Sequence, residues 1–465
     1  MDADADAISF GTDGWRATLD VFTDERVRMV GQAVATYLRE QEPGGTVVVG
    51  YDARESSPGF AEELSRVLAA NGFDVLVPPR DLPTPVVGWT VRERSLRGGL
   101  MLTASHNPPE YNGVKFLPGD GAPALPAVTD ALEDRLAPPD PLPEPEHGTV
   151  TETDLVGPYL DDALDAIGAD LSGLSVVYDA MHGSGRGVTD DLLERAGADV
   201  ERLRCERDAD FGGTPPEPEP DRLETLAERV ADDADLGVAN DGDADRVTLV
   251  TPDRGVLDPN LFLAATYDAL LDGETGLPAE GDVVRTVSTS SIVDRVADDH
   301  GQSVHETAVG FKWVAEAMAD HDALLGGEES GGYGVTRHLR NKDGVYVALL
   351  AAAIHAAESY DDRLAALRER YGEIHQSRIS VDCPEERKEP VLSELETALP
   401  DAVAGADVAD VNTVDGFKIA LADGTWLLVR PSGTEPKLRV YAEAGSPDRV
   451  ETLLAAGRDL VEPLV

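Results

Sequence analysis

A candidate nucleophile stands in a polar loop, residues 103–115, with the sequence Thr-Ala-Ser-His-Asn-Pro-Pro-Glu-Tyr-Asn-Gly-Val-Lys. The loop directly follows the apolar segment Gly99 to Leu102, which we expect to be a strand. Ligands bind beyond the carboxyl ends of strands in open α/β sheets, and a serine hydroxyl there can carry a transferred group. Ser105 is therefore a candidate catalytic residue, although an ordinary turn with Asn-Gly punctuation explains the same letters.

Carboxylates occur at alternate positions in the segment 239–246, again after a short apolar run. Asp241, Asp243 and Asp245 can converge on one hard cation, and oxygen ligands with room for water suit Mg²⁺. Calcium is the rival ion, but an EF-hand loop needs a glutamate at its twelfth position and flanking helices, whereas a predicted strand follows here. A solvated acidic turn is the simpler alternative, and the neighbouring Arg246 argues against it.

Two further loops carry groups suited to a sugar phosphate. In the segment 326–332, Gly-Gly-Glu-Glu-Ser-Gly-Gly, the side chains of Glu328 and Ser330 can bond vicinal hydroxyls, although a flexible glycine turn would look the same. The segment 430–439 follows a predicted strand and forms a compact anion cradle of one guanidinium, two hydroxyls and freed backbone amides. Its candidate phosphate-binding residues are Arg430, Ser432, Gly433 and Thr434.

Several other ligand classes are excluded. The Gly-Lys-Ser/Thr phosphate loop is missing, and no predicted strand leads into Gly-x-Gly-x-x-Gly, so neither a nucleoside triphosphate nor a dinucleotide cofactor is expected. Cys205 and Cys383 lie far apart without metal spacing, which argues against a disulfide framework or a zinc site. The chain has 89 acidic and 39 basic residues and a formal charge of -50, so nucleic acid is not an expected partner.

The acidic excess is spread along the chain and does not form a tail. We interpret it as a surface adaptation to high salt, which predicts a halophilic source, and not as cation binding at every site. No apolar run is long enough to cross a bilayer, and the start Met1 to Asp4 does not have the pattern of a signal peptide. We therefore expect a soluble, cytoplasmic protein without a membrane partner, and the oligomeric state stays open.

The elements that must position these loops alternate along the chain. Short valine-rich runs such as 46–49 are followed by helix-period segments such as 58–70, which is typical of α/β domains with largely parallel sheets. This unit occurs three times, and proline-rich or polar stretches separate its copies. After residue 371 the pattern changes to strands typical of a smaller α+β domain. The predicted domains are 1–143, 144–255, 256–370 and 371–465.

The four loops, in this order and at these spacings, resemble the α-D-phosphohexomutase superfamily, and the opening Phe-Gly-Thr-Asp-Gly-Trp-Arg of residues 10–16 is similar to its amino-terminal motif. The resemblance covers essentially the whole chain, and five motifs in sequence order make coincidence negligible. It implies three similar mixed α/β sandwich domains and a smaller carboxyl-terminal α+β domain, heart-shaped around one cleft. Each domain would contribute one loop.

The resemblance also implies an activity, that of an intramolecular phosphotransferase interconverting hexose 1-phosphate and hexose 6-phosphate. A phosphorylated Ser105 and a hexose 1,6-bisphosphate would carry the phosphoryl group, and Ser105 with the three aspartates would hold Mg²⁺. Lys115 would be the general base if neighbouring cations depress its pKa. The other implied catalytic residues are Arg16, His106 and Arg246, with Glu328 and Ser330 on the sugar and residues 430–434 on the unreacting phosphate.

The sugar is less firmly indicated. Residues 103–115, 310–313 and 342–344 look more like phosphoglucomutases than phosphoglucosamine mutases, so we expect glucose phosphate, with mannose phosphate and then glucosamine phosphate as alternatives. Bifunctional phosphomannomutase/phosphoglucomutases commonly place a histidine where this chain has Gly332, and His338 is a weak substitute. A phosphatase and a non-catalytic sugar-phosphate sensor are the rival functions, and the intact Ser105 counts against the sensor.

Overall fold

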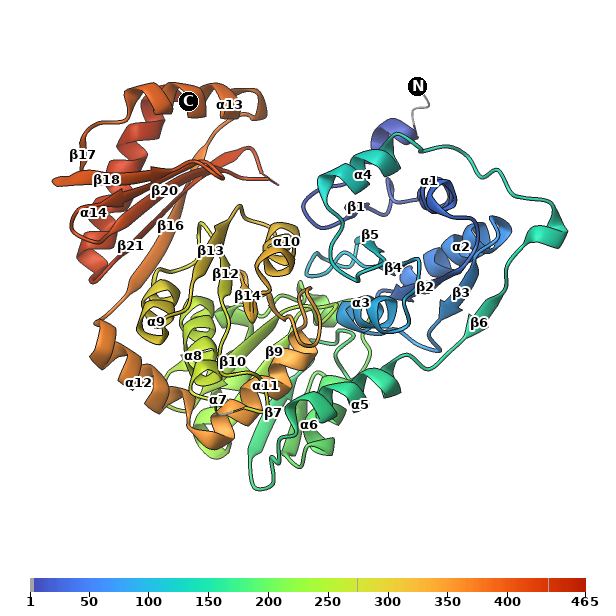
Figure 1. Ribbon diagram of the computed structural model, residues 1–465, viewed down its shortest axis with the longest axis horizontal. Coiled ribbons are helices and arrows are strands. Elements are labelled where there is room, and N and C mark those ends of the chain that lie inside the picture. The colour runs from blue at the N-terminus through green and yellow to red at the C-terminus, as the bar shows by residue number, and fades with distance from the viewer. Residues whose placement is uncertain (1–3, 274, 434) are drawn as a thin grey trace.

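Four separate β-sheets organise the chain, each within its own stretch of sequence (Figure 1). They are seen in a computed structural model, which describes residues 4–273, 275–433 and 435–465. Three mixed sheets with packed helices precede an antiparallel sheet, so the fold class expected from the sequence is confirmed. Within the described residues, no helix is both long and apolar enough to cross a membrane.

The first sheet has the strand order β1-β5-β4-β2-β3-β6 and is apolar on both faces. Val47 and Val49 of β2 pack in the same core as α1 and α2, while Val48 faces the core that contains α3. This double burial explains the uninterrupted valine run. β6 pairs in parallel with β3, so the first sheet extends beyond residue 143. The elements are β1 (Trp15–Thr18), α1 (Asp24–Gln41), β2 (Thr46–Tyr51), α2 (Ser57–Ala70), β3 (Asp74–Val77), α3 (Thr84–Glu93), β4 (Gly98–Leu102), β5 (Tyr111–Pro118), α4 (Pro126–Glu133) and β6 (Val150–Glu152).

The second sheet has the order β11-β10-β9-β7-β8, in which β8, β7 and β9 are parallel and β10 is antiparallel to β9. Its elements are α5 (Val156–Ile167), β7 (Ser175–Asp179), α6 (Thr189–Arg195), β8 (Asp199–Leu203), α7 (Glu224–Asp233), β9 (Leu236–Asn240), β10 (Val247–Thr251) and β11 (Gly255–Val256).

The third sheet has the order β13-β12-β14-β15, with β15 antiparallel to β14. Its elements are α8 (Pro259–Leu271), β12 (Val283–Thr286), α9 (Ile292–His300), β13 (Val304–Thr307), α10 (Phe311–His321), β14 (Leu325–Gly327), β15 (Tyr333–Val335), α11 (Gly344–Ala357) and α12 (Tyr360–Tyr371).

The first three sheets share one local plan at the strand that precedes a functional loop. In each, a strand leads into the loop and the chain returns as its antiparallel neighbour, in the pairs β4/β5, β9/β10 and β14/β15. The three loops therefore occupy equivalent places at the ends of equivalent strands. This equivalence is the structural form of the repeat expected from the sequence.

The fourth sheet is antiparallel throughout, in the order β16-β21-β20-β19-β18-β17. α13 and α14 share a core with one face, while Trp426, Leu428 and Tyr441 on the other face pack with Val287 of the third domain. The elements are β16 (His375–Asp382), α13 (Glu385–Ala398), β17 (Ala402–Val403), β18 (Ala406–Asn412), β19 (Phe417–Leu421), β20 (Trp426–Pro431), β21 (Lys437–Ala444) and α14 (Pro447–Val461). Short 3₁₀ turns occur at Ala5–Ala7, Glu144–Glu146, Phe211–Gly213, Pro220–Arg222 and Glu462–Leu464.

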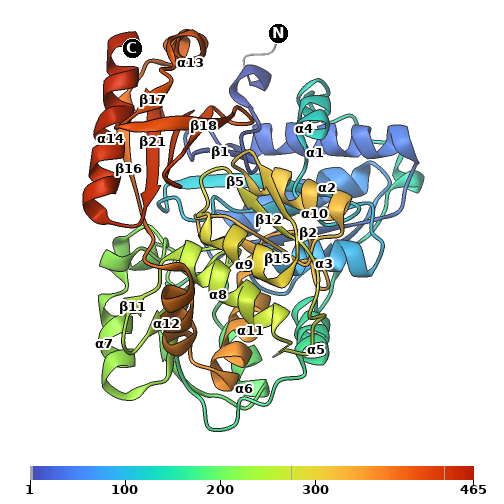
Figure 2. The same ribbon diagram turned by 60° about the vertical axis from the view of Figure 1, so that its left-hand side comes forward.

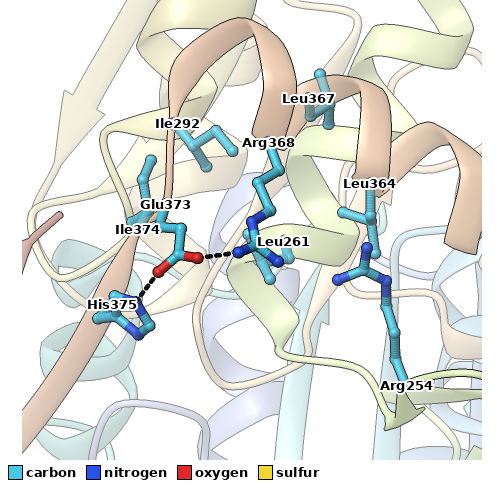
Figure 3. Close-up of a pocket in the computed structure, with 10 residues that line it drawn as sticks. Arg254, Leu261, Ile292, Leu364, Leu367, Arg368, Glu373, Ile374 and His375 are labelled. Atoms are coloured by element: carbon cyan, nitrogen blue, oxygen red, sulfur yellow. Dashed lines mark hydrogen bonds and ion pairs between the residues drawn. The ribbon is translucent and has the colours of Figure 1, made fainter. Parts of the chain in front are cut away.

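One large hydrophobic core runs through the first three domains, whereas the fourth has a core of its own. Figure 2 shows the fourth sheet at one end of the molecule, connected to α12 through the start of β16. A cavity of about 270 Å³ lies at this connection, lined by apolar side chains and by Glu373, which pairs with Arg368 and, at 3.1 Å, with His375 (Figure 3). The connection thus combines a small apolar space with an ion pair next to Gly372.

Candidate active site

A cavity of about 380 Å³ collects side chains from all four domains. Its size lies within the range of small-molecule sites. The loops of the first three domains reach it because they follow the carboxyl ends of parallel strands, the usual place for ligands in open sheets, whereas the fourth follows the antiparallel strand β20. Of the residues predicted from the sequence, Arg16, His106, Arg246, Glu328, Ser330, Arg430, Ser432 and Gly433 line it. Thr434 lies outside the described residues.

Ser105 is fully buried and does not itself line this cavity, but it directly precedes His106, which does. Its Oγ donates to Oδ2 of Asp241 at 2.9 Å and lies 3.3 Å from Nδ1 of His106. Ser105 adopts a left-handed backbone conformation with φ 52°, and its amide donates to Oγ1 of Thr103 at 2.8 Å. Burial, followed by the charges of Arg246 and Arg16, lowers the pKa of His106 to about 2. The imidazole beside the nucleophile is therefore neutral at working pH.

The loop that carries Ser105 is held by a buried guanidinium that sequence reasoning missed. Arg54 donates to the carbonyl oxygens of Ser105 at 2.8 Å, Asn107 at 2.6 Å and Pro108 at 2.6 Å. Asp52 pairs with Arg54 at 3.0 Å and compensates its charge. Only the position of the Asp-Ala-Arg segment at the end of a predicted strand could have pointed to it.

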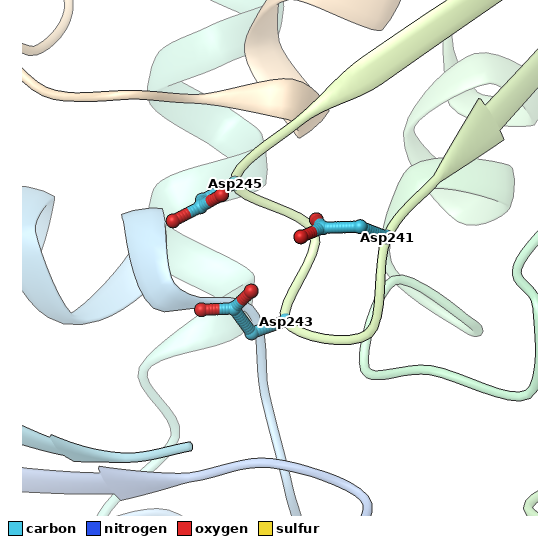
Figure 4. A group of neighbouring side chains, drawn as sticks. All are labelled: Asp241, Asp243 and Asp245. Carbon is cyan, nitrogen blue, oxygen red and sulfur yellow. The ribbon is translucent and has the colours of Figure 1, made fainter. Parts of the chain in front are cut away.

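The carboxylates of Asp241, Asp243 and Asp245 converge between β9 and β10 (Figure 4). One oxygen from each lies within 4.8 Å of the others, and all three residues are buried. Oδ1 of Asp243 and Oδ1 of Asp245 have no hydrogen-bond partner. Burial, and then the charges of Asp243 and Asp245, raise the pKa of Asp241 well above its ordinary value. Buried, unpaired and mutually repelling carboxylate oxygens fit a hard divalent cation such as Mg²⁺.

Glycine is required inside this loop. A Cβ on Gly242 would lie 2.6 Å from the carbonyl oxygen of Ser105. The loop of the second domain and the loop of the first domain therefore touch through their backbones. This contact brings the nucleophile and the carboxylates together.

Two buried lysines bind the same group of carboxylates. Nζ of Lys115 lies 3.0 Å from Asp13, 2.9 Å from Asp243 and 2.8 Å from Asp245. Burial alone would lower the pKa of Lys115, but these carboxylates outweigh it and hold the pKa well above its usual range. The condition we attached to Lys115 as a general base, a depressed pKa, is therefore not met in this structure.

The second lysine, Lys342, was not among the predicted site residues. Its Nζ lies 3.1 Å from Asp13 and 2.8 Å from Asp245. It also lines the cavity, as do Lys312 and Arg439, which sequence reasoning also missed.

The loop 326–332 presents a buried carboxylate. Oε1 of Glu328 accepts from the amide of Gly310 at 2.9 Å, and Ser330 Oγ lies 3.5 Å from Oε2. Burial raises the pKa of Glu328 to about 7. A Cβ on Gly332 would lie only 2.6 Å from Cδ of Lys342, so the lysine stem fills the space that a side chain at 332 would need.

The fourth domain contributes Arg430, whose Nε donates to Oδ2 of Asp415 at 2.8 Å. The same oxygen of Asp415 accepts from the amide of Val309 at 3.1 Å, which joins the fourth domain to the third beside the cavity. The carbonyl of Ser432 accepts from Nζ of Lys388 at 2.6 Å. These contacts hold Arg430 and the backbone of Ser432 at the cavity wall.

His338 does not take the place of a side chain at 332. It is only 1% exposed and does not line the cavity. Its ring packs against Tyr346 and Tyr159, with centroids 4.0 Å and 5.1 Å away. The weak expectation for His338 was wrong because the segment after β15 turns this side chain into the core.

Family models match almost the whole chain. They describe the phosphoglucomutase/phosphomannomutase α/β/α domains I, II and III at residues 7–141, 158–255 and 258–371, and the carboxyl-terminal domain at 379–460. A protein designated a probable phosphoglucosamine mutase from Methanopyrus kandleri is 35% identical, over 98% of both chains. A phosphoglucomutase/phosphomannomutase from Thermococcus kodakarensis is 31% identical over 97% of this chain and 98% of its own. A phosphopentomutase from the same organism is also 31% identical, over 98% of both.

Solved structures have the same fold. The crystal structure of a protein designated a phosphomannomutase from Thermus thermophilus is 33% identical and superposes with a TM-score of 0.83, covering 98% of this chain and 99% of the other. The Aspergillus fumigatus N-acetylphosphoglucosamine mutase, in complex with glucose 1,6-bisphosphate, is 15% identical with a TM-score of 0.61, covering 99% and 98%. The second likeness concerns the fold alone.

Proposed function

The chain belongs to the phosphoglucomutase/phosphomannomutase family, and on that premise we propose that it interconverts glucose 1-phosphate and glucose 6-phosphate. It is a phosphohexomutase, an intramolecular phosphotransferase. The observation that carries the proposal is the buried Ser105 hydroxyl, 2.9 Å from Asp241 and next to His106, which lines a cavity rich in cationic side chains. Positioning and charge neutralisation are the main demands of phosphoryl transfer.

The proposed cycle has two half-reactions. O6 of a hexose 1-phosphate attacks the phosphorus of phosphorylated Ser105, the bond from phosphorus to Oγ breaks, and the proton of O6 ends on Oγ. The hexose 1,6-bisphosphate then turns over in the cavity, Oγ attacks the phosphorus on O1, the bond from phosphorus to O1 breaks, and the proton of Oγ ends on O1. Hexose 6-phosphate leaves, and the serine is phosphorylated again.

The side chains divide this work. Asp241, Asp243 and Asp245, with Ser105, would hold Mg²⁺, which when bound neutralises charge on the transferred phosphoryl group. Arg16 and Arg246 add fixed positive charge, and Nδ1 of neutral His106 lies 3.3 Å from Oγ. Glu328 and Ser330 would bind hydroxyls that both orientations share, while Arg430, Ser432 and Gly433, with Thr434, would grip the unreacting phosphate.

The choice of glucose over glucosamine rests on charge. Relatives of nearly equal identity are named for glucosamine, glucose or mannose, and pentose phosphates, so identity alone does not choose. Cationic side chains outnumber carboxylates along the described cavity wall, where Asp13 and Glu328 stand among Arg16, Arg246, Lys312, Lys342, Arg430 and Arg439. This balance suits two phosphates and disfavours the ammonium that glucosamine carries at C2. Glucosamine phosphate is the second candidate, supported by the name of the Methanopyrus relative.

The test compares turnover of glucose 1-phosphate, mannose 1-phosphate and glucosamine 1-phosphate, with Mg²⁺, catalytic bisphosphate and molar salt. We expect glucose 1-phosphate to be converted fastest and Ser105→Ala to lose nearly all turnover while keeping its melting temperature. Conversion confined to glucosamine 1-phosphate would replace the proposed sugar. Free phosphate accumulating faster than isomer would indicate a phosphatase, and silence on all three sugars would indicate a sensor.

A further inference from the structure

The loop 241–246 between β9 and β10, which carries the three aspartates and is called the metal loop below, is held by Thr84, the first residue of α3 in the first domain. Oγ1 of Thr84 donates to Oδ2 of Asp243 at 2.5 Å, and the amide of Thr84 donates to the carbonyl of Asp243 at 2.9 Å. Thr84 is 2% exposed and Asp243 is fully buried. One residue of the first domain thus fixes both the backbone and the side chain of an aspartate 159 positions away.

Further buried hydrogen bonds between the first and second domains surround this contact. Arg186 of the second domain forms two hydrogen bonds, of 2.6 Å and 2.7 Å, with the carboxylate of Asp81, and both residues are buried. Arg186 also donates to the carbonyl of Gly183 at 2.6 Å, and the next amide, of Ser184, donates to the carbonyl of Gly242 at 2.9 Å. The segment from Asp81 to Thr84 therefore docks against the metal loop as a unit, so Thr84 has little freedom to move.

The two oxygens of Asp243 have different surroundings. Oδ2 accepts from Thr84 and, at 2.9 Å, from Lys115. Oδ1 is buried and has no hydrogen-bond partner. Donors on one oxygen fix the rotation of the carboxylate and leave the other oxygen as the electron-pair donor for a cation. The arrangement thus distinguishes the oxygen that binds from the oxygen that orients.

We propose that Thr84 is a positioning residue for the cation, which holds Oδ2 of Asp243 so that Oδ1 is presented to the metal. This inference rests on the proposed role of the three aspartates. The neighbours of Thr84 favour a fixed hydroxyl, because Pro83 and Pro85 restrict the backbone on both sides. Since α3 and the Ser105 loop belong to the same domain, the contact also sets the metal loop relative to the nucleophile.

The test is the Mg²⁺ affinity of the full chain, measured calorimetrically after chelator treatment and without substrate. Thr84→Val removes the donor and keeps the shape, and we expect it to weaken Mg²⁺ binding about tenfold to a hundredfold. Thr84→Ser keeps the hydroxyl and should stay within about threefold of the wild type. Thr90→Val is the matched control, because Thr90 is a buried threonine of the same helix whose hydroxyl donates to the carbonyl of Val86 at 2.7 Å.

Equal Mg²⁺ affinity of Thr84→Val and Thr90→Val would overturn the proposal, and a wild-type chain that binds no Mg²⁺ would overturn the metal assignment on which it rests. If Thr84→Val melts below the assay temperature, Thr84→Cys carries the test, since its thiol is a weaker donor and a several-fold loss is expected. An error in the proposed sugar specificity would be detected separately, because the specificity is measured by turnover of the sugar phosphates and does not enter these Mg²⁺ affinities.

Discussion

Glu328 is a buried residue of the cavity whose charge changes near neutral pH. Burial raises its pKa to about 7, so the carboxyl gains a proton as the pH falls through that value. An ionised carboxylate accepts hydrogen bonds from hydroxyls on both oxygens, and a protonated one loses part of that capacity. In the sugar-binding role proposed for Glu328, this titration would make binding of the sugar sensitive to pH near neutrality.

We predict that KM for the sugar phosphate rises as the pH is lowered from about 8 to about 6 in the wild type, because Glu328 becomes protonated. Glu328→Gln should raise KM at every pH and abolish this rise, since an amide does not titrate. Ser330→Ala is the control, expected to raise KM while keeping the slope. Steady-state kinetics across this range is the measurement, and equal slopes in the wild type and Glu328→Gln would contradict the assignment. Because its pKa is lowered to about 2, His106 should contribute no change of KM with pH in this range.

At the residue scale, sequence motifs located several of the groups that line the cavity, but missed others and the groups that hold the loops in place. Ser105, Glu328 and Arg430 stand in loops whose letters indicate chemistry. Arg54 and Lys342 do not, because their roles depend on contacts with distant segments, such as the 329 positions between Lys342 and Asp13. The condition attached to Lys115 as a general base, a depressed pKa, is not met for the same reason, since no local pattern reveals which charges surround a lysine.

At the element scale, α11 connects the core to the cavity. The helix is buried along nearly its whole length and packs with α5, α6 and β9. Its N-cap, Asp343, accepts from the amide of Tyr346 at 2.9 Å and from the hydroxyl of Tyr159 at 2.6 Å. Because Lys342 directly precedes this cap, the start of the helix also sets the position of the lysine.

We predict that Asp343→Ala lowers the free energy of unfolding by about 2–4 kcal/mol, because it removes a cap and leaves the buried hydroxyl of Tyr159 unpaired. It should also reduce turnover, because it displaces Lys342, which lines the cavity and pairs with Asp13 and Asp245. The matched control is Asp258→Ala at the N-cap of α8, where Asp258 accepts from the amides of Asn260 and Leu261. That change should cost about 1 kcal/mol and leave turnover unaltered. Urea unfolding and steady-state rates measure both effects, and equal losses of stability would contradict the role of Tyr159.

Sequence periodicity predicted helices and strands well where the apolar residues recur regularly and the element is buried. The expected helix at 58–70 is Ser57–Ala70 in the structure, and the valine run 46–49 lies within β2. β6 was not foreseen as part of the first sheet, because Val150–Glu152 is exposed and lies beyond a proline-rich stretch. Pairing of a short edge strand is decided by tertiary contact and not by its own letters.

At the scale of the whole molecule, charge is the dominant feature. A formal charge of -50 on 465 residues opposes the compact state through self-repulsion. The cationic cavity is the exception, and two of its cations, Lys342 and Arg430, are paired with the partly buried carboxylates of Asp13 and Asp415. Repulsion therefore acts mainly between surface groups, where dissolved ions screen it.

We predict that the melting temperature rises by several degrees or more when KCl is increased from about 0.1 M to about 2 M, because the screening length falls from about 10 Å to a few Å. Sucrose at equal osmolality is the control, since it is excluded from protein surfaces but carries no charge. Differential scanning calorimetry measures both. A rise no larger in KCl than in sucrose would mean that the acidic surface does not limit stability.

The close fit between Gly332 and the side chain of Lys342 has a consequence for which substitutions the chain tolerates at these two positions. A side chain gained at position 332 while Lys342 is still present would collide with Cδ and Cγ, at 2.6 Å and 2.9 Å from a Cβ built there. Loss of Lys342 first would leave Asp13 and Asp245 with one cation fewer. Each substitution alone is therefore expected to disturb the site, so we expect the two positions to change together.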